Sequence, residues 1–279
     1  LTNKGSIDGS YYPSGTPLIA HGSDPFFYVK NGSIDNSGSI KGVEEFKTRS
    51  DSTLPSFTSG ADYSITNSGT ISNKRYLLFR ANTYNRISVS SNPNNSTGSV
   101  INKGVLLLFS SRFYDELTAK ANNDVSIGGQ IEQPRPGDTT PSTVSASNPL
   151  GSANLQAGYN NTTNTYQKGT LTLSTPLAVY NEYNLDVRGQ QVKVMANLSN
   201  VTSLTDSTPS GKITINAGDK PKSGYAIRVA KGATVSANEV DVYGRNGTDH
   251  PNVILQGTLS GNTIQLGGTS SSPSFSQYN

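Results

Sequence analysis

Residues able to carry out chemistry are few and scattered in this 279-residue chain. The two histidines, His21 and His250, lie far apart in the sequence and have no evident partner. The absence of cysteine excludes a thiol nucleophile and a cysteine-ligated zinc site. No His-rich motif and no Asp-x-Asp-x-Gly calcium spacing occurs. The sequence therefore predicts no catalytic residue, no metal site and no cofactor.

Two pairs of opposite charge come nearest to an active site, Asp186 with Arg188 and Asp241 with Arg245. A polysaccharide lyase or hydrolase would need such groups gathered on one face. Each pair is better explained as a surface ion pair, which contributes at most ~1 kcal/mol to stability. We therefore expect a binding protein and not an enzyme.

Tyrosine is the side chain best suited to ligand contact here, with 14 tyrosines against 8 phenylalanines. A tyrosine offers a rigid ring and a hydroxyl group to a sugar or a protein. The candidates in polar or loop contexts are Tyr11, Tyr12, Tyr159 and Tyr166.

The composition favours short strands joined by polar turns. Hydrophobic residues make up 32% and charged residues 15% of the chain, with 28 glycines and a net charge of only +3. Low net charge argues against the disordered class. Asn, Ser, Thr and Gly disfavour helix, and only residues 113–121 could form two helical turns. Lys and Arg are scattered, without the basic patch that nucleic-acid binding requires.

One motif recurs along the chain: Asn-x-Gly, a small residue, then an aliphatic residue. Its asparagines are Asn3, Asn36, Asn67 and Asn102, and more degenerate copies surround Gly169, Gly232 and Gly257. The first four motif glycines are separated by 33, 31 and 35 residues (38 − 5, 69 − 38, 104 − 69). The next two intervals, 65 and 63 residues (169 − 104, 232 − 169), are close to two such periods. The last interval, between Gly232 and Gly257, is 25 residues (257 − 232). Self-similarity at a period in the low thirties indicates a solenoid.

We therefore predict an all-β fold, a right-handed parallel β-helix of about nine coils in one domain, residues 1–268. Stacked coils would share a core that no single unit could bury. The aliphatic residue would point inward, and glycine would take the left-handed conformation at the corner. The four asparagines would form a structural ladder between coils. We expect loop insertions near 43–62 and 132–165 and a flexible tail over 269–279.

The phrases Asn36-Ser37-Gly38-Ser39-Ile40 and Asn67-Ser68-Gly69-Thr70-Ile71 resemble those of filamentous-haemagglutinin-type exoproteins and autotransporter passenger domains of Gram-negative bacteria. The likeness covers most of residues 1–131 and weakly 166–268. It implies a β-helix exported to the cell surface as an adhesin or toxin stalk, contacting a glycan or protein of a host or neighbouring cell.

Three functions stay open at this point: an adhesin that binds through protruding loops, a carbohydrate-active enzyme or phage tailspike, and a self-associating surface-layer or stalk segment. The lack of cysteine suits an exported bacterial protein. No apolar run of about 18 residues is present. We expect the chain to be part of a longer protein that touches a membrane only through a C-terminal anchor or barrel outside this sequence.

Overall fold

The computed structural model describes only part of the chain. The described residues are 1–8, 26–30, 33–42, 45–50, 64–73, 76–83, 99–108, 116–121, 123–134, 140–160, 165–166, 169–180, 185–202, 207–217, 225–243, 253–267 and 275–277. Within these ranges every element is a β-strand and there is no helix. This confirms the predicted all-β class. The possible helix at 113–121 is wrong, because residues 116–121 form a strand.

Two long sheets run through the described structure, and all of their strands are parallel. The ten-stranded sheet contains, in spatial order, β1 (Thr2–Asn3), β4 (Ile34–Asn36), β7 (Ile65–Asn67), β10 (Val100–Asn102), β13 (Val125–Ile127), β19 (Thr170–Leu173), β22 (Gln191–Val194), β25 (Ile227–Val229), β28 (Val253–Leu255) and β31 (Phe275–Gln277). The nine-stranded sheet contains β3 (Phe26–Lys30), β6 (Glu45–Ser50), β9 (Tyr76–Thr83), β12 (Glu116–Ala121), β16 (Ser152–Ala157), β21 (Leu185–Gly189), β24 (Lys212–Ala217), β27 (Glu239–Tyr243) and β30 (Thr263–Gly267).

Two shorter sheets follow one another along the chain. The six-stranded sheet contains β15 (Pro141–Thr143), β14 (Gln130–Pro134), β11 (Val105–Leu108), β8 (Thr70–Asn73), β5 (Ser39–Lys41) and β2 (Ser6–Asp8). The four-stranded sheet contains β20 (Leu177–Tyr180), β23 (Leu198–Val201), β26 (Thr234–Ser236) and β29 (Thr258–Ser260). A separate antiparallel hairpin pairs β17 (Tyr159–Asn160) with β18 (Thr165–Tyr166).

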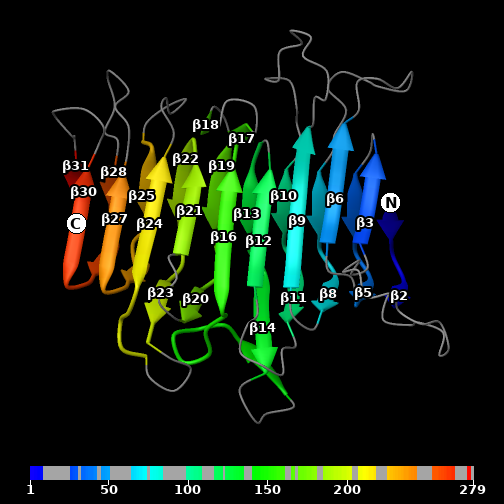
Figure 1. The fold of residues 1–279 in the computed structure, drawn as a ribbon, viewed down its shortest axis with the longest axis horizontal. Coiled ribbons are helices and arrows are strands. Elements are labelled where there is room, and N and C mark those ends of the chain that lie inside the picture. The colour runs from blue at the N-terminus through cyan, green and yellow to red at the C-terminus, as the bar shows by residue number, and fades with distance from the viewer. Residues whose placement is uncertain are drawn as a thin grey trace, which may run out of the picture.

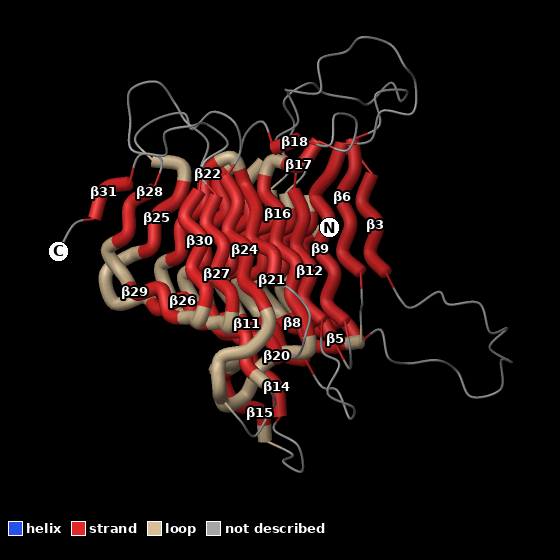
Figure 2. Tube along the Cα trace, turned by 60° about the vertical axis from the view of Figure 1, so that its left-hand side comes forward, coloured by secondary structure: helices blue, strands red, loops and turns tan. Residues whose placement is uncertain are grey.

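Strands stack in the order in which the chain makes them. Figure 1 shows the nine-stranded sheet from β3, in blue, to β30, in red, with its strands upright and side by side. Figure 2 shows the other sheets stacked along the same direction. In the ten-stranded sheet, for example, Asn3 lies opposite Asn36, 33 residues away, and Asn36 lies opposite Asn67, 31 residues away.

The core lies along the inside of the stack, where equivalent aliphatic residues lie in register. Ile40, Ile71, Leu106 and Ile131 occupy matched positions on four successive strands, and each is at most 1% exposed. Strands such as β24 alternate strictly between partly exposed and buried residues. Burying one such side chain contributes roughly 1.5–3 kcal/mol, so one core serves many short strands.

The four motif asparagines lie in one buried column. Asn3 Nδ2 donates to Asn36 Oδ1 at 2.8 Å, Asn36 Nδ2 to Asn67 Oδ1 at 2.7 Å, and Asn67 Nδ2 to Asn102 Oδ1 at 2.8 Å. Asn102 Nδ2 donates to the Gly128 carbonyl oxygen at 2.6 Å. The next register position holds Ile127, so the column changes there from polar to apolar.

The motif glycines are needed for a different reason from the predicted one. A Cβ on Gly38 would lie 2.0 Å from the Gly5 carbonyl oxygen, and the same distance separates a Gly69 Cβ from Gly38 O and a Gly104 Cβ from Gly69 O. The left-handed conformation occurs in this column at Gly129, with φ of 68°, but not at Gly38, Gly69 or Gly104. Close backbone stacking, therefore, excludes a side chain at these three corners.

Residues 45–50 and 152–157, placed in predicted loop insertions, are in fact strands of the nine-stranded sheet. β6 pairs with β3 and β9 and buries Phe46 completely. β16 pairs with β12 and β21 and buries Ala153, Leu155 and Ala157. The other residues of 43–62, apart from β6, lie outside the described residues.

Two prolines of the 132–165 segment, Pro134 and Pro141, lie in strands at the edge of a sheet. Pro134 and Pro141 face each other in the antiparallel pair of β14 and β15, and β15 is the edge strand of its sheet. An edge position can lack a backbone N–H donor. In the predicted flexible tail, residues 275–277 form β31 beside β28, so that part of the tail is a strand.

Candidate functional site

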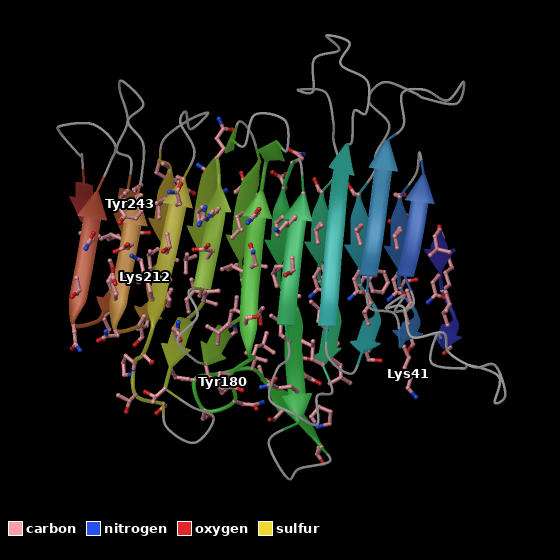
Figure 3. The ribbon with its side chains drawn as sticks, viewed as in Figure 1. Lys41, Tyr180, Lys212 and Tyr243 are labelled. Atoms are coloured by element: carbon pink, nitrogen blue, oxygen red, sulfur yellow. The ribbon has the colours of Figure 1, made fainter. Side chains whose placement is uncertain are left out.

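The outer face of the nine-stranded sheet carries polar side chains on the strands β16, β21, β24 and β27. Along each strand the side chains alternate between the core and this face. On β24, Ile213 and Ile215 are fully buried, whereas Lys212, Thr214 and Asn216 are partly exposed. Figure 3 shows this sheet in front, with Lys212 and Tyr243 labelled on its strands β24 and β27. No described element crosses over this face in Figures 1 and 2.

A charged cluster joins β24 and β27 on this face. Lys212 lies opposite Glu239 in the register, and its Nζ is 2.7 Å from Glu239 Oε1. The same ammonium group forms an ion pair with Asp241 Oδ2. The Tyr243 hydroxyl donates a hydrogen bond of 2.8 Å to Asp241 Oδ2. The Lys212 ammonium group therefore forms ion pairs with two carboxylates, those of Glu239 and Asp241.

Asp241 is the buried member of this charged cluster, with 1% of its surface exposed. Its Oδ2 accepts from Lys212 and Tyr243, but its Oδ1 is buried and has no hydrogen-bond partner among the described residues. A buried carboxylate requires compensation by opposite charge or by hydrogen bonds. Lys212 and Tyr243 therefore hold this carboxylate in position.

The cluster keeps its donors protonated. The hydrogen bonds to Asp241 and Glu239 raise the pKa of Lys212 above the usual lysine range. The hydrogen bond to Asp241, together with burial, raises the pKa of Tyr243. Lys212 is thus an ammonium ion and Tyr243 a neutral phenol at physiological pH. Neither side chain can act as a base in the arrangement described.

A second polar group lies on the neighbouring strands β16 and β21. Arg188 Nη2 is 2.7 Å from Asp186 Oδ2, and the two side chains are 37% and 28% exposed. On β16, Gln156 Nε2 donates to Asn154 Oδ1 at 2.8 Å. Asn154 lies opposite Asp186 and Gln156 opposite Arg188. These side chains form a continuous polar surface across two strands.

The sequence-predicted candidates are only partly brought together. Asp186 contacts Arg188 as an ion pair on the surface. Arg245 lies outside the described residues, and the contacts of Asp241 come from Lys212 and Tyr243. Lys212 was missed because it is 29 residues from Asp241 in sequence (241 − 212). The repeat spacing was the signal that could have found it, since it places Lys212 opposite Glu239.

The candidate tyrosines fall on different parts of the molecule. Tyr11 and Tyr12 lie outside the described residues, as do both histidines. Tyr159 and Tyr166 are direct partners in the β17–β18 hairpin. The ladder residues Asn3, Asn36, Asn67 and Asn102 are inside the stack and do not reach the outer face.

No group of three or more His, Cys, Asp or Glu side chains in the described ranges is arranged to hold a metal ion. In the same ranges no helix is long and apolar enough to cross a membrane.

No protein-family model, curated protein or solved structure matches the chain at a significant level.

Proposed function

We propose that the chain is a right-handed parallel β-helix segment of an exported bacterial surface protein that binds a glycan or protein on a host or neighbouring cell without altering it. The order of strands supports the β-helix. From β1 to β12 the chain visits the ten-stranded, six-stranded and nine-stranded sheets in turn and then repeats. From β19 to β30 the four-stranded sheet takes the place of the six-stranded one. The surface location, at the outer membrane of a Gram-negative cell, rests on the resemblance of the Asn-Ser-Gly repeat.

The observation that carries the binding function is the polar outer face of the nine-stranded sheet. Its side chains are held by their neighbours, as Lys212 is held by Glu239 and Asp241. A surface whose groups are already ordered loses less entropy when a ligand binds. A sheet of this length therefore offers a rigid, extended contact surface to a long ligand.

The test exposes the purified chain to a panel of glycans and to a panel of cells. Binding to glycans, to bacterial cells and to cultured host cells is measured by fluorescence, and each polysaccharide is then analysed for new reducing ends and unsaturated products. We expect saturable binding to at least one ligand and no products. Turnover of any polysaccharide, or binding to none of the ligands, would contradict the proposal.

Point substitutions, and not a deletion, can test whether the predicted 132–165 loop contributes to ligand binding. Deleting 132–165 would remove β16 from the middle of a sheet. Replacing Tyr159 and Tyr166 by alanine leaves that strand in place. Unchanged cell binding by this double variant would assign the contact to the sheet face rather than to the hairpin.

A carbohydrate-active enzyme is the second candidate, and the two carboxylates on β27 favour it. Glu239 and Asp241 are two residues apart on one strand, so both point to the same face. Glycoside hydrolysis commonly uses a pair of carboxyl groups. Here, however, Lys212 binds both. If the product analysis detects turnover, Glu239→Gln and Asp241→Asn should each abolish it.

A further inference from the structure

Three neighbouring strands of the nine-stranded sheet, β24, β27 and β30, present nine outward residues in register. On β24, Ile213 and Ile215 between these positions are fully buried. On β27, Val240 and Val242 are buried in the same way. We call the nine outward residues the Tyr243 patch; its rows across the three strands are Lys212, Glu239 and Thr263, then Thr214, Asp241 and Gln265, then Asn216, Tyr243 and Gly267.

Several polar side chains of the Tyr243 patch have no partner within the described part of the chain. Thr214 and Asn216 are partly exposed and Thr263 is exposed, and no described residue forms a hydrogen bond with any of these three side chains. The Glu239 side chain is 34% exposed, and only its Oε1 is bound to Lys212 in this part of the structure. The patch therefore offers both hydrogen-bond donors and acceptors to a ligand.

The neighbouring strands β16 and β21 differ in this respect. There Gln156 donates to Asn154, and Arg188 forms an ion pair with Asp186. Polar groups that already bind one another gain less from a ligand than groups whose partner is water, since a ligand can replace that water. The outer face thus changes along the sheet from paired polar groups on β16 and β21 to unpaired ones on β24 and β30.

Tyr243 is the aromatic member of the patch, and its hydroxyl group is fixed. The hydroxyl donates to Asp241 Oδ2 at 2.8 Å and lies 3.4 Å from Gln265 Oε1. Asp241 is held in turn by its ion pair with Lys212. Figure 3 shows Tyr243 and Lys212 on the same sheet face. A side chain that is already ordered loses less entropy when a ligand binds.

Gly267 leaves space beside the Tyr243 ring. The two residues are register partners, and a Cβ on Gly267 would lie 3.4 Å from Tyr243 Cδ1 and 3.5 Å from Cε1. A side chain there would pack against the ring, as cross-strand neighbours of aromatic residues do. Glycine weakens a strand, and it often occurs where a ligand approaches the backbone closely. The ring therefore has no side chain of β30 over it at this position.

The charge and composition of the patch limit the kind of ligand. One lysine and two carboxylates give it a net charge of −1 (1 − 2), which disfavours an acidic polymer. None of its nine residues is aliphatic, whereas the centre of a protein–protein interface is normally apolar. A neutral ligand rich in hydroxyl groups matches both properties.

We infer that the Tyr243 patch binds a neutral polysaccharide, with one sugar ring against the Tyr243 side chain. An aromatic ring offers an apolar surface to the C–H groups of a sugar, and its polar end stays hydrogen-bonded. Neighbouring strands are about 4.8 Å apart, so Asn216 on β24 and Gln265 on β30 flank such a sugar and bind its hydroxyl groups. This inference rests on the proposed binding function and names its site and ligand class.

The test compares Gly267→Val with Thr258→Val. Both substitutions introduce valine, on the consecutive strands β30 and β29, but β29 belongs to the four-stranded sheet and not to the patch. Binding of the whole chain to immobilised mannan, β-glucan and galactan is measured by biolayer interferometry at several salt concentrations, with polygalacturonate as the anionic control. We expect saturable binding to at least one neutral polysaccharide, with an affinity that changes less than twofold with salt. G267V should bind that polysaccharide at least tenfold more weakly, and T258V should stay within twofold of the unmodified chain.

A fold control accompanies the binding data. Valine favours a strand more than glycine does, and its Cβ would meet the Tyr243 ring at an ordinary contact distance. G267V is therefore expected to melt at no lower a temperature than the unmodified chain. Should it unfold instead, Gln265→Ala provides the second variant, because this side chain is exposed; a loss of affinity of at least threefold is expected. Loss of binding at unchanged stability assigns the effect to the patch.

Three outcomes would overturn the inference: G267V and Q265A binding like the unmodified chain, T258V losing as much affinity as G267V, or polygalacturonate binding more tightly than every neutral polysaccharide. A chain that binds cells or proteins but no neutral polysaccharide would overturn the Tyr243 patch and leave the proposed function standing. Turnover of a neutral polysaccharide would overturn the proposed function and leave the patch as the substrate contact.

Discussion

Asp241 shows how a single buried carboxylate depends on its neighbours. It is 1% exposed and takes its compensation from Lys212 and Tyr243. In Asp241→Asn the ammonium group loses its buried partner, so we expect the free energy of unfolding to fall by about 1–3 kcal/mol. Glu239→Gln is the matched control, since the Glu239 side chain is 34% exposed and its pair contributes at most ~1 kcal/mol. Urea denaturation of both variants measures the difference, and equal losses would contradict the assigned role of burial.

The raised pKa values of Lys212 and Tyr243 predict loss of stability in alkali. Both groups bind their protons more tightly in the folded chain than in the unfolded one. Their contribution is therefore complete below the unfolded pKa values of about 10–10.4 and is lost as the pH rises through the folded values. We expect the unmodified chain to lose more stability between about pH 10 and pH 12 than Lys212→Gln does. Parallel losses in the two proteins, measured by urea denaturation, would refute this.

At the scale of the strand and its corner, the glycine column makes the most specific prediction. An alanine at Gly69 would place its Cβ 2.0 Å from the backbone oxygen of Gly38, and backbone cannot move aside as a side chain can. Overpacking typically lowers the free energy of unfolding by about 1–3 kcal/mol. We expect Gly69→Ala to lower it by about 3 kcal/mol or more. Gly5→Ala is the control, because nothing lies within 4 Å of the corresponding position there. Thermal melts of the two variants should therefore separate clearly; similar melting temperatures would show that the corners can relax.

The sequence was informative where the repeat was regular. The Asn-x-Gly spacing predicted strands on either side of each glycine, and β4, β5, β7 and β8 lie there. The role of the glycine itself was not predictable from one coil, because it depends on the backbone of the adjacent one. The Cβ position of Gly69 lies close to the Gly38 carbonyl oxygen only when Gly69 is stacked on Gly38 in the folded chain.

Strands with weak apolar signals were missed. In β16 two of the three buried residues are alanines, Ala153 and Ala157, which have little weight in a hydrophobic pattern. In β6 the charged Glu45, Lys47 and Arg49 obscured the buried Phe46. The pairing of Lys212 with Asp241 was missed for a related reason, since local reasoning paired Asp241 with the nearer Arg245. Long-range register decides these contacts.

For the molecule as a whole, stacking makes each layer depend on its neighbours, so stability should vary along the stack. β30 is an edge strand, whereas β21 and β24 are paired on both sides. Ile264 and Leu266 are 42% and 38% exposed, although their register partners Val240 and Val242 are fully buried. The layer at β30 therefore gains less from burial than the layers inside.

We expect native-state hydrogen exchange to reveal this gradient, with the weakest protection on β30 and the strongest on β21 and β24. A register-matched pair of substitutions tests the same point by equilibrium unfolding. Ile264→Ser should cost less than ~1 kcal/mol because its side chain already contacts water, whereas Val240→Ser removes a fully buried aliphatic group and should cost about 2–3 kcal/mol. Uniform protection along the stack, or equal costs for the two substitutions, would mean that the stack unfolds as one unit and that another surface covers its end.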